Sequence, residues 1–250
     1  MKYKMLCAVA LFALAIPVHN HAQGRRGQPP QPPKAAAPID LTGYWVSVIT
    51  EDWRVRMVTP RKGFYESVPM TAEARRVADT WDPAKDEAAG NPCKAYAPPG
   101  LMRIPGRLHI TWQDDSTLKM ETDAGTQTRI FHFAGPADRP PAVEKSLQGY
   151  SMAQWEFADA TRGQARKGNL KVVTTQMRAG YLRKNGVPFS ENAVLTEYYD
   201  RITTPNGEQW IVLTAVVDDP IYLNPSFAVS TNYKLEPNGS KWNPTPCSAR

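Results

Sequence analysis

Nine short runs of strand-forming residues, separated by turn residues, constrain the fold of this chain more than any other feature. The runs are rich in Val, Ile, Thr, Tyr, Phe and Trp and have the length of single β-strands. Turn signals such as Asp114-Asp115, Ala124-Gly125, Asn206-Gly207 and Asn238-Gly239 lie between or after them. We expect strands within residues 43–49, 106–113, 117–123, 126–133, 150–157, 169–175, 193–202, 208–217 and 227–236.

Helical patterns are scarce beside these runs. Residues 71–81 favour a helix that begins after Thr71 as its N-cap, and Asp82-Pro83 starts a further turn that Gly90 ends. Sequential strands with few crossover helices indicate antiparallel neighbours rather than a parallel sheet. The sequence therefore predicts an all-β protein, a meandering antiparallel lipocalin-like barrel of about nine strands with one or two short helices.

The first residues have the layout of a secretory signal peptide. Two lysines precede an apolar run over residues 5–18, and the small residue Ala22 suits a cleavage site. The run is shorter than the ~20 residues that a membrane-spanning helix needs. We expect residues 1–22 to be a signal peptide, the protein to be periplasmic or secreted, and no stable membrane insertion.

Residues 23–38 are rich in Pro, Gln and Ala and lack apolar periodicity, so we expect a disordered tether. The remaining residues, 39–250, suit a single β-barrel domain. The net charge of +6 owes much to Arg25, Arg26 and Lys34 in the tether. The basic composition therefore gives no indication of nucleic-acid binding, because basic and aromatic residues do not interleave.

Two cysteines belong to the domain, Cys93 and Cys247. In an exported protein an even pair favours a disulfide, and so we expect these two to be bonded. Their spacing, without nearby histidines, is not that of a zinc site. We find no nucleophile elbow, glycine-rich phosphate loop or HExxH motif, and we expect no metal and no cofactor.

The two hairpins within residues 106–133 contain both histidines of the domain. Tight turns at Asp114-Asp115 and Ala124-Gly125 would place His109 opposite Met120 and Met120 opposite Arg129. One face would then carry His109, Thr111, Leu118, Met120, Thr122, Gln127, Arg129, Phe131 and Phe133. The other would carry Leu108, Ile110, Trp112, Lys119, Glu121, Thr128, Ile130 and His132. The first face is the better candidate for the barrel interior, and the two histidines point opposite ways.

An interior Arg129 requires a partner, because an unpaired charge at low dielectric is very costly. The candidates are Glu156, Glu197 or an anionic or carbonyl oxygen of a ligand. The facing of Glu197 is open. A two-residue turn at Asn206-Gly207 and a three-residue turn that begins at Pro205 place it on opposite sides of the sheet. The alternative is that His109 is an ordinary core histidine and Arg129 a structural or surface ion-pair residue.

Two stretches resemble known families. The segment LTGYW, residues 41–45, resembles the Gly-x-Trp start of lipocalin-like (calycin) barrels. Residues 149–222 resemble a large group of exported bacterial proteins without a settled activity, in which Tyr150 here replaces an expected His. The matching positions are Gly149, Ser151, Trp155, Glu156, Val172, Thr174, Gly186, Pro188, Ser190, Glu197, Tyr199, Arg201, Asp219 and Pro220. The resemblance implies an exported β-barrel and draws attention to Glu156, Glu197 and Arg201.

These observations predict an exported barrel protein that binds a partly apolar small molecule with an anionic or carbonyl group. The expected ligand-binding residues are His109, Met120, Gln127, Arg129, Phe131, Glu156, Glu197 and Tyr199. The first alternative is a cofactor-independent isomerase, cyclase or lyase. In that enzyme His109 would be the general acid or base, Arg129 or Tyr150 would stabilise oxyanion charge, and Glu197 would assist. The second alternative is a structural or interaction protein that docks through the tether and an exposed sheet edge.

Overall fold

The computed structural model describes residues 31–135, 138–158 and 167–250, and every structural statement below concerns these residues. The expected signal peptide over residues 1–22 lies outside them. No helix in the described ranges is both long enough and apolar enough to cross a membrane.

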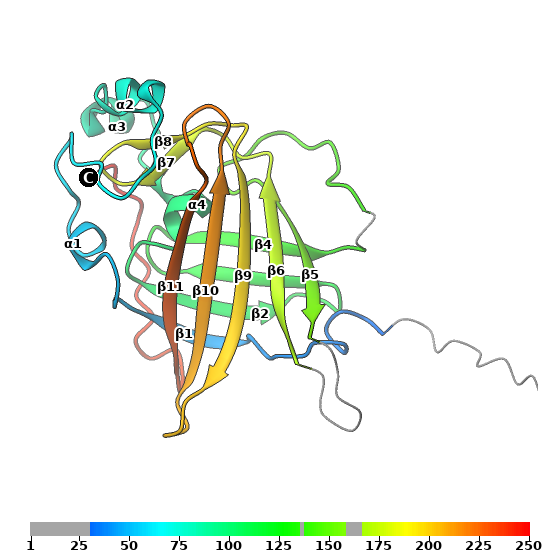
Figure 1. The fold of residues 1–250 in the computed structure, drawn as a ribbon. Coiled ribbons are helices and arrows are strands. Elements are labelled where there is room, and N and C mark those ends of the chain that lie inside the picture. Colours follow the sequence, from blue (N-terminus) through cyan, green and yellow to red (C-terminus); the bar gives the residue numbers. More distant parts are fainter. Residues whose placement is uncertain (1–30, 136–137, 159–166) are drawn as a thin grey trace, which may run out of the picture. The chain divides into compact units, whose positions relative to one another are not determined.

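The nine expected strands are all present and close into one barrel, as Figure 1 shows. The strand order around the barrel is β1-β11-β10-β9-β6-β5-β4-β3-β2. The prediction of an all-β barrel is therefore confirmed. The barrel strands are β1 (Gly43–Val48), β2 (Arg107–Trp112), β3 (Thr117–Thr122), β4 (Gln127–Phe133), β5 (Tyr150–Phe157), β6 (Gly168–Thr175), β9 (Val194–Thr203), β10 (Gln209–Asp218) and β11 (Phe227–Glu236).

One neighbouring pair, β4 and β5, is parallel, whereas the other pairs around the barrel are antiparallel. A closed ring with an odd number of strands cannot reverse direction at every step, so one pair must be parallel. The connection from Phe133 to Tyr150 has the length that a parallel connection needs, a dozen residues or more. The antiparallel meander expected from the sequence is thus interrupted at this pair.

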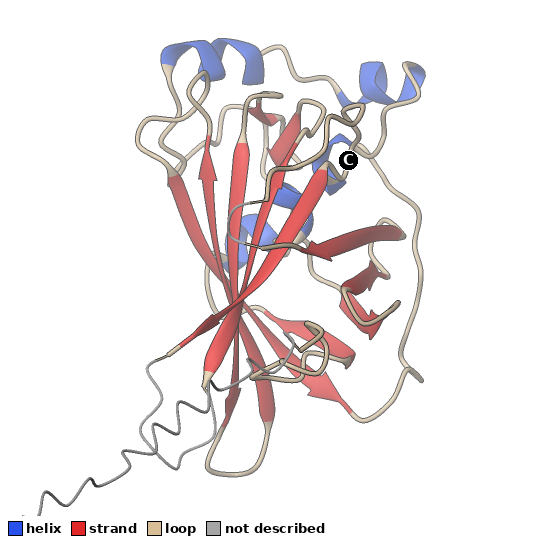
Figure 2. Cartoon of the chain, turned by 90° about the vertical axis from the view of Figure 1, so that its right-hand side faces the viewer, coloured by secondary structure: helices blue, strands red, loops and turns tan. Residues whose placement is uncertain are grey.

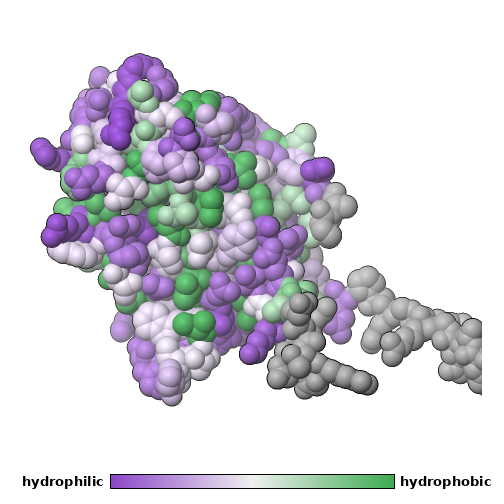
Figure 3. Space-filling view, in the orientation of Figure 1, coloured by the Kyte–Doolittle hydropathy of each residue, from purple (hydrophilic) through white to green (hydrophobic). Residues whose placement is uncertain are grey.

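The barrel interior is filled by side chains that alternate along each strand. In β10 every second residue from Ile211 to Val217 is buried, and its neighbours are partly exposed. On β1, Trp45 is fully buried and its indole N–H donates to the carbonyl oxygen of Leu41 at 2.9 Å. The outer surface in Figure 3 mixes hydrophilic and hydrophobic residues, as water-facing sheet surfaces do.

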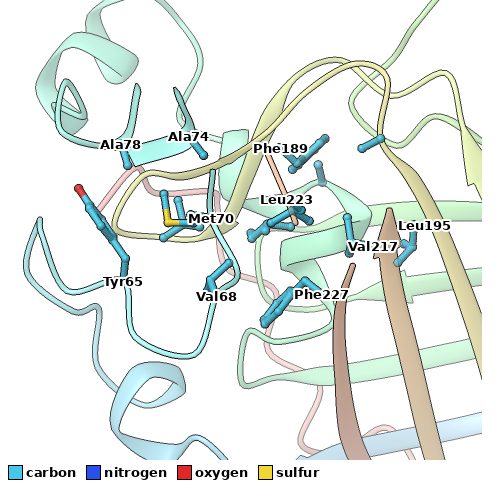
Figure 4. Close-up of a cluster of buried hydrophobic side chains, with 14 of the residues drawn as sticks. Tyr65, Val68, Met70, Ala74, Ala78, Phe189, Leu195, Val217, Leu223 and Phe227 are labelled. Atoms are coloured by element: carbon cyan, nitrogen blue, oxygen red, sulfur yellow. The ribbon is translucent and has the colours of Figure 1, made fainter. Parts of the chain in front are cut away.

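A second apolar cluster lies beside one end of the barrel. The hairpin of β7 (Gly180–Arg183) and β8 (Val187–Phe189) lies between β6 and β9 in the chain. These two strands were not predicted from the sequence, because both are very short. Figure 4 shows side chains from residues 65–78 gathered with Phe189, Leu223 and Phe227. This cluster fixes the hairpin and the helical segment against the barrel end.

The helices are short and lie mostly toward one end of the barrel, as Figure 2 shows. They are α1 (Trp53–Arg56), α2 (Ala72–Ala78), α3 (Pro83–Ala88), η1 (Lys94–Tyr96) and α4 (Pro98–Leu101). The expected helix starts are confirmed. The Thr71 hydroxyl accepts from the Ala74 N–H at 3.1 Å, and the Asp82 carboxylate accepts from the Ala84 N–H at 3.1 Å.

The expected disulfide is present between Cys93 and Cys247. It ties the end of the chain to the residue before η1. Nearby, the Thr245 N–H donates to the carbonyl oxygen of Asp123 at 2.8 Å. The C-terminal segment is therefore held on the turn between β3 and β4.

The described part of the proline-rich tether, residues 31–38, contacts the barrel. The Trp155 indole N–H donates to the carbonyl oxygen of Pro33 at 2.8 Å, and the Lys34 N–H donates to that of Asp115 at 3.0 Å. These two hydrogen bonds hold the described part of the segment on the barrel, and proline-rich backbone has little conformational freedom to lose when it is held.

Candidate functional site

The barrel interior contains one arginine–glutamate pair that is closed off from solvent. Arg129 on β4 donates from Nη1 to Glu197 Oε1 at 2.9 Å and from Nη2 to Glu197 Oε2 at 2.5 Å. Both side chains have 0% exposure. The three-residue turn before β10 aligns Thr203 with Gln209, and this register places Glu197 inside. The expected inward facing of Arg129 is confirmed, and Glu197 is its partner.

Neighbouring strands add hydrogen bonds to this pair, whereas Arg129 Nε is buried and has no hydrogen-bond partner among the described residues. The Tyr199 hydroxyl donates to Glu197 Oε1 at 3.0 Å, and Arg129 Nη2 donates to Thr174 Oγ1 at 3.3 Å. The hydroxyl of Ser151 lies 2.7 Å from that of Thr174. Four strands, β4, β5, β6 and β9, thus contribute to one polar network.

Neighbouring charges keep Arg129 in its charged form. Burial alone would lower the pKa of Arg129, but Glu197 and Tyr199 raise the pKa above its ordinary value. Burial raises the pKa of Tyr199, and the Glu197 carboxylate raises it further. Arg129 also lies 4.9 Å from the centre of the Phe131 ring, and Met120 beside it is fully buried. The charge of Arg129 is therefore neutralised by the protein itself.

The predicted position of His109 is wrong. His109 pairs with Glu121 and not with Met120, so β2 is shifted by one residue against β3 and His109 lies on the outer face. Its ring stacks on Tyr44 with centroids 4.1 Å apart, and its Nδ1 lies 3.2 Å from Glu121 Oε2. Leu108, Ile110 and Trp112 face inward instead.

The loop between β2 and β3 explains the shift. Asp114 accepts hydrogen bonds from the N–H and the hydroxyl of Ser116, and the Gln113 N–H donates to the carbonyl oxygen of Thr117. This local turn consumes one more residue than the tight hairpin that we expected. The alternation of Leu108, Ile110 and Trp112 with polar residues was the signal that would have given the correct facing.

Both histidines lie on the outer face and not on opposite faces. His132 pairs with Thr117 and stacks on Tyr150, with ring centroids 4.6 Å apart. The four residues of the enzyme alternative are therefore divided. Arg129 and Glu197 meet in the interior, whereas His109 and Tyr150 lie outside and belong to separate aromatic contacts.

The other expected site residues are also dispersed. Glu156 lies on the outer face and pairs with Lys171 at 3.4 Å. Gln127 donates to the carbonyl oxygen of Gly125 at 2.6 Å and accepts from the Gln148 amide at 2.8 Å. Arg201 donates to the carbonyl oxygen of Asp40 at 2.6 Å. In the described part of the structure, Glu156, Gln127 and Arg201 make no hydrogen bond to Arg129 or Glu197.

A cationic pocket outside the barrel was not predicted from the sequence. Its cavity of about 270 Å³ is lined by four cationic side chains and by apolar groups. The cationic residues come from α1, from the loop after α4, and from the end and following turn of β7. The lining residues are Val55, Arg56, Met57, Thr59, Ala95, Gly100, Arg103, Ile104, Pro105, Leu182, Arg183 and Lys184. We call this the arginine pocket.

Backbone carbonyl groups hold the three arginines in place. Arg56 Nε donates to Arg103 O at 3.0 Å, Arg103 Nη1 to Ser230 O at 2.7 Å, and Arg183 Nη1 to Glu66 O at 2.7 Å. The side chains of Arg56 and Arg103 are only 2% and 10% exposed. The guanidinium groups are thus fixed before any ligand arrives.

Two carboxylates next to the pocket only partly balance these charges. Glu51 pairs with Arg56 and lies 3.5 Å from Arg103, and Asp52 pairs with Arg103 at 2.5 Å. Arg56 Nη2 is buried and has no hydrogen-bond partner among the described residues. An unmet buried donor is costly, so an acceptor that reached it would be bound favourably.

The pKa values of two of these arginines are lowered mainly by burial. Burial lowers the pKa of Arg56 and the neighbouring Arg103 lowers it further, while Glu51 opposes them. Burial also lowers the pKa of Arg183, Asp52 opposes this, and Arg103 lowers it again. An anion bound beside these guanidinium groups would oppose both shifts, because an opposite charge favours the charged form.

No periodic pattern in the sequence indicates the arginine pocket. Arg56, Arg103 and Arg183 lie far apart in the chain, on a four-residue helix, a loop and a four-residue strand. The basic segment WRVRM, residues 53–57, was the only local hint. Within the described ranges, no group of three or more His, Cys, Asp or Glu residues is arranged to hold a metal ion.

The fold and the arginine pocket together define an all-β barrel protein with an external cationic cavity. No family model matches the chain, and no solved structure matches it. Pleckstrin homology domain-containing family G member 5 of Mus musculus is 32% identical over 90 residues. The match covers 35% of this chain and 8% of the mouse protein, and it assigns neither a family nor an activity.

Proposed function

We propose that this protein binds a partly apolar small molecule through an anionic group, in an oxidising compartment outside the cytoplasm. The observation that supports it is the arginine pocket, where Arg56, Arg103 and Arg183 converge on one cavity. The ligand class is the one expected from the sequence. The site differs, because the interior Arg129 is already neutralised by Glu197.

The pocket lining matches a ligand with two chemically different parts. Guanidinium groups suit carboxylate and phosphate oxygens, which accept paired hydrogen bonds from one planar fork. The remaining lining is largely aliphatic and comes from Val55, Met57, Ile104, Pro105 and Leu182. The volume of about 270 Å³ lies near the lower end of small-molecule sites.

The proposed compartment and origin rest on separate observations. The Cys93–Cys247 disulfide supports an oxidising environment. The layout of residues 1–22 supports export, and residues 149–222 resemble exported bacterial proteins. The lipocalin-like assignment rests on the barrel itself and on the LTGYW segment.

The test is calorimetric titration of the purified protein with sodium octanoate, and with octanol as a neutral probe of similar length. We expect octanoate to bind and octanol to bind at least about tenfold more weakly, which corresponds to about 1.4 kcal/mol for the charged contact. Arg183→Gln should weaken octanoate binding by a similar factor. Arg178→Gln, which changes an exposed arginine away from the pocket, is the matched control and should bind as wild type does.

Two results would contradict the proposal. Equal affinity for octanoate and octanol would show that the anionic group is not recognised. Loss of binding in a folded double variant, Arg129→Met with Glu197→Leu, while Arg183→Gln binds as wild type does, would place the site inside the barrel. Native mass spectrometry of the protein as purified would identify a retained ligand directly.

A further inference from the structure

A group of exposed apolar side chains lies directly beside the arginine pocket. Trp53, Met57 and Val58 are 59%, 59% and 69% exposed, and all three lie within six consecutive positions on and after α1. Trp53 and Met57 are four residues apart in helical conformation, so they share one face. We call these three residues the apolar ridge. Such grouped exposure differs from single scattered apolar residues, which are normal on a surface.

The apolar ridge and the arginine pocket are joined through shared residues. Met57 belongs to the ridge and also lines the pocket. A second hollow of about 230 Å³ is lined by Trp53 and Phe64, and it shares Val55 and Arg183 with the arginine pocket. The two hollows thus share lining residues, and apolar side chains lie among charged ones from the cationic cavity to the exposed tryptophan.

The charges around the ridge are mainly positive. Arg54 lies with its guanidinium carbon 5.3 Å from the centre of the Trp53 ring, and it is exposed. Among the described residues that line the two hollows or pair with their arginines, Arg54 and the four cations of the pocket are accompanied by three carboxylates, those of Glu51, Asp52 and Glu66. Glu51 and Asp52 are engaged in ion pairs, so the free charge of this surface is positive.

We propose that the apolar ridge docks the protein on a bilayer that contains anionic phospholipids, and that the arginine pocket takes a lipid phosphate there. This deepens the proposed function, because it rests on the pocket as an anion receptor. A tryptophan and aliphatic side chains beside arginines are the composition that lies at the boundary of headgroups and acyl chains. Anionic lipid surfaces attract such cationic sites, and each Lys or Arg near the surface adds to the attraction.

Figure 1 shows that α1 lies at the outer edge of the fold, away from the barrel strands. The ridge could therefore touch a flat surface without any rearrangement of the barrel. The contact is peripheral, because α1 has only four residues and cannot insert as a spanning helix.

Flotation of the full chain with lipid vesicles tests this proposal. The vesicles are phosphatidylcholine alone, or phosphatidylcholine with about one third phosphatidylglycerol, at low and at high salt. We expect flotation with the phosphatidylglycerol vesicles, at least about tenfold stronger binding than to phosphatidylcholine alone, and weakening at high salt. Equal binding to both compositions overturns the proposal.

Variants distinguish binding through the apolar ridge from nonspecific adsorption of the protein to lipid. Trp53→Ser with Met57→Ser should weaken vesicle binding at least about tenfold, because the buried apolar area is lost. The matched control is Ile202→Ser with Ile221→Ser, which removes two other exposed apolar side chains, 46% and 42% exposed. The control should float as wild type does. Unchanged flotation of the ridge variant, or equal loss in the control, overturns the proposal.

Fluorescence reports whether Trp53 enters the lipid. The chain has 7 tryptophans, so the comparison of wild type with Trp53→Phe isolates this one. We expect a blue shift on phosphatidylglycerol vesicles that is lost in Trp53→Phe while flotation is retained. A blue shift that persists in Trp53→Phe contradicts insertion of Trp53 and overturns the proposed docking face.

The outcomes also distinguish this inference from the proposed function. If octanoate binds at the pocket but vesicles do not, the docking proposal fails and the pocket remains a site for soluble anions. If inorganic phosphate competes with octanoate while vesicles still do not bind, the pocket binds a free phosphate and not the phosphate of a lipid. If neither octanoate nor vesicles bind, both proposals fail.

Discussion

Arg129 and Glu197 form a two-pronged ion pair at the centre of the barrel, and neither side chain has any contact with solvent. They come from β4 and β9, which are not neighbours in the barrel order. The pair therefore reaches past β5 and β6 and links two strands that are not hydrogen-bonded to each other. The ion pair therefore has a structural role, and each of its two charges is balanced by the other.

Removal of one partner of this pair should destabilise the fold strongly. Arg129→Met leaves the Glu197 carboxylate buried without its countercharge, and we expect the free energy of unfolding to fall by about 3–5 kcal/mol. Urea denaturation followed by tryptophan fluorescence measures the change. Glu197→Leu should have a loss in the same range, because it leaves Arg129 unpaired.

The double variant Arg129→Met with Glu197→Leu provides the control. Because both charges are removed together, its loss should be smaller than that of either single variant. Losses that simply add would show that the two side chains do not interact. The double variant also keeps the comparison usable if a single variant fails to fold.

Anions should stabilise the wild-type protein through the arginine pocket. A ligand at a hundred times its dissociation constant adds about 2.7 kcal/mol to the free energy of unfolding. Thermal unfolding in octanoate should therefore shift upward in wild type and much less in Arg183→Gln. Lys171→Gln changes a cation of the outer barrel face, and its shift should equal that of wild type. An equal shift in all three proteins would indicate a general effect of the additive.

His132 should make stability depend on pH. Burial lowers its pKa below the ordinary value of 6.5, and Asp114 only partly opposes this. The unfolded chain then takes up a proton at higher pH than the folded chain, so stability falls as pH falls through 6.5 and levels off below the folded pKa. His132→Gln should remove this part of the dependence in urea unfolding between about pH 8 and pH 5. A difference between wild type and variant that stays constant with pH would contradict the assignment.

The strands were predictable because each is a local pattern. The run NLKVVTT, residues 169–175, ends in four consecutive β-branched residues, and the structure places β6 there. The closure of the ring was also a physical expectation, since a closed barrel leaves no strand edge unpaired. The parallel β4–β5 pair was not predicted, because it depends on the path of a long connection and not on the composition of either strand.

The candidate site was only partly predictable, because side-chain facing depends on loop geometry. The turn predicted at Ala124-Gly125 gave the correct pairing of Met120 with Arg129, and this pairing placed Arg129 inside the barrel. One extra residue in the loop after β2 turned His109 outward. The arginine pocket has no pattern in the sequence, since three segments without regular periodicity meet there only in the folded chain.

The disulfide should contribute strongly to stability, because it links residues separated by 154 positions. In the chain-entropy model such a loop restricts the unfolded state by up to roughly 5 kcal/mol. The variant Cys93→Ala with Cys247→Ala should therefore unfold at a lower urea concentration than wild type. Reduction with dithiothreitol should lower the wild-type midpoint toward that of the variant and leave the variant unchanged. Identical midpoints for reduced and oxidised wild type would show that the bond adds nothing beyond the contacts of η1 and the C-terminal segment, such as the Thr245 hydrogen bond to Asp123.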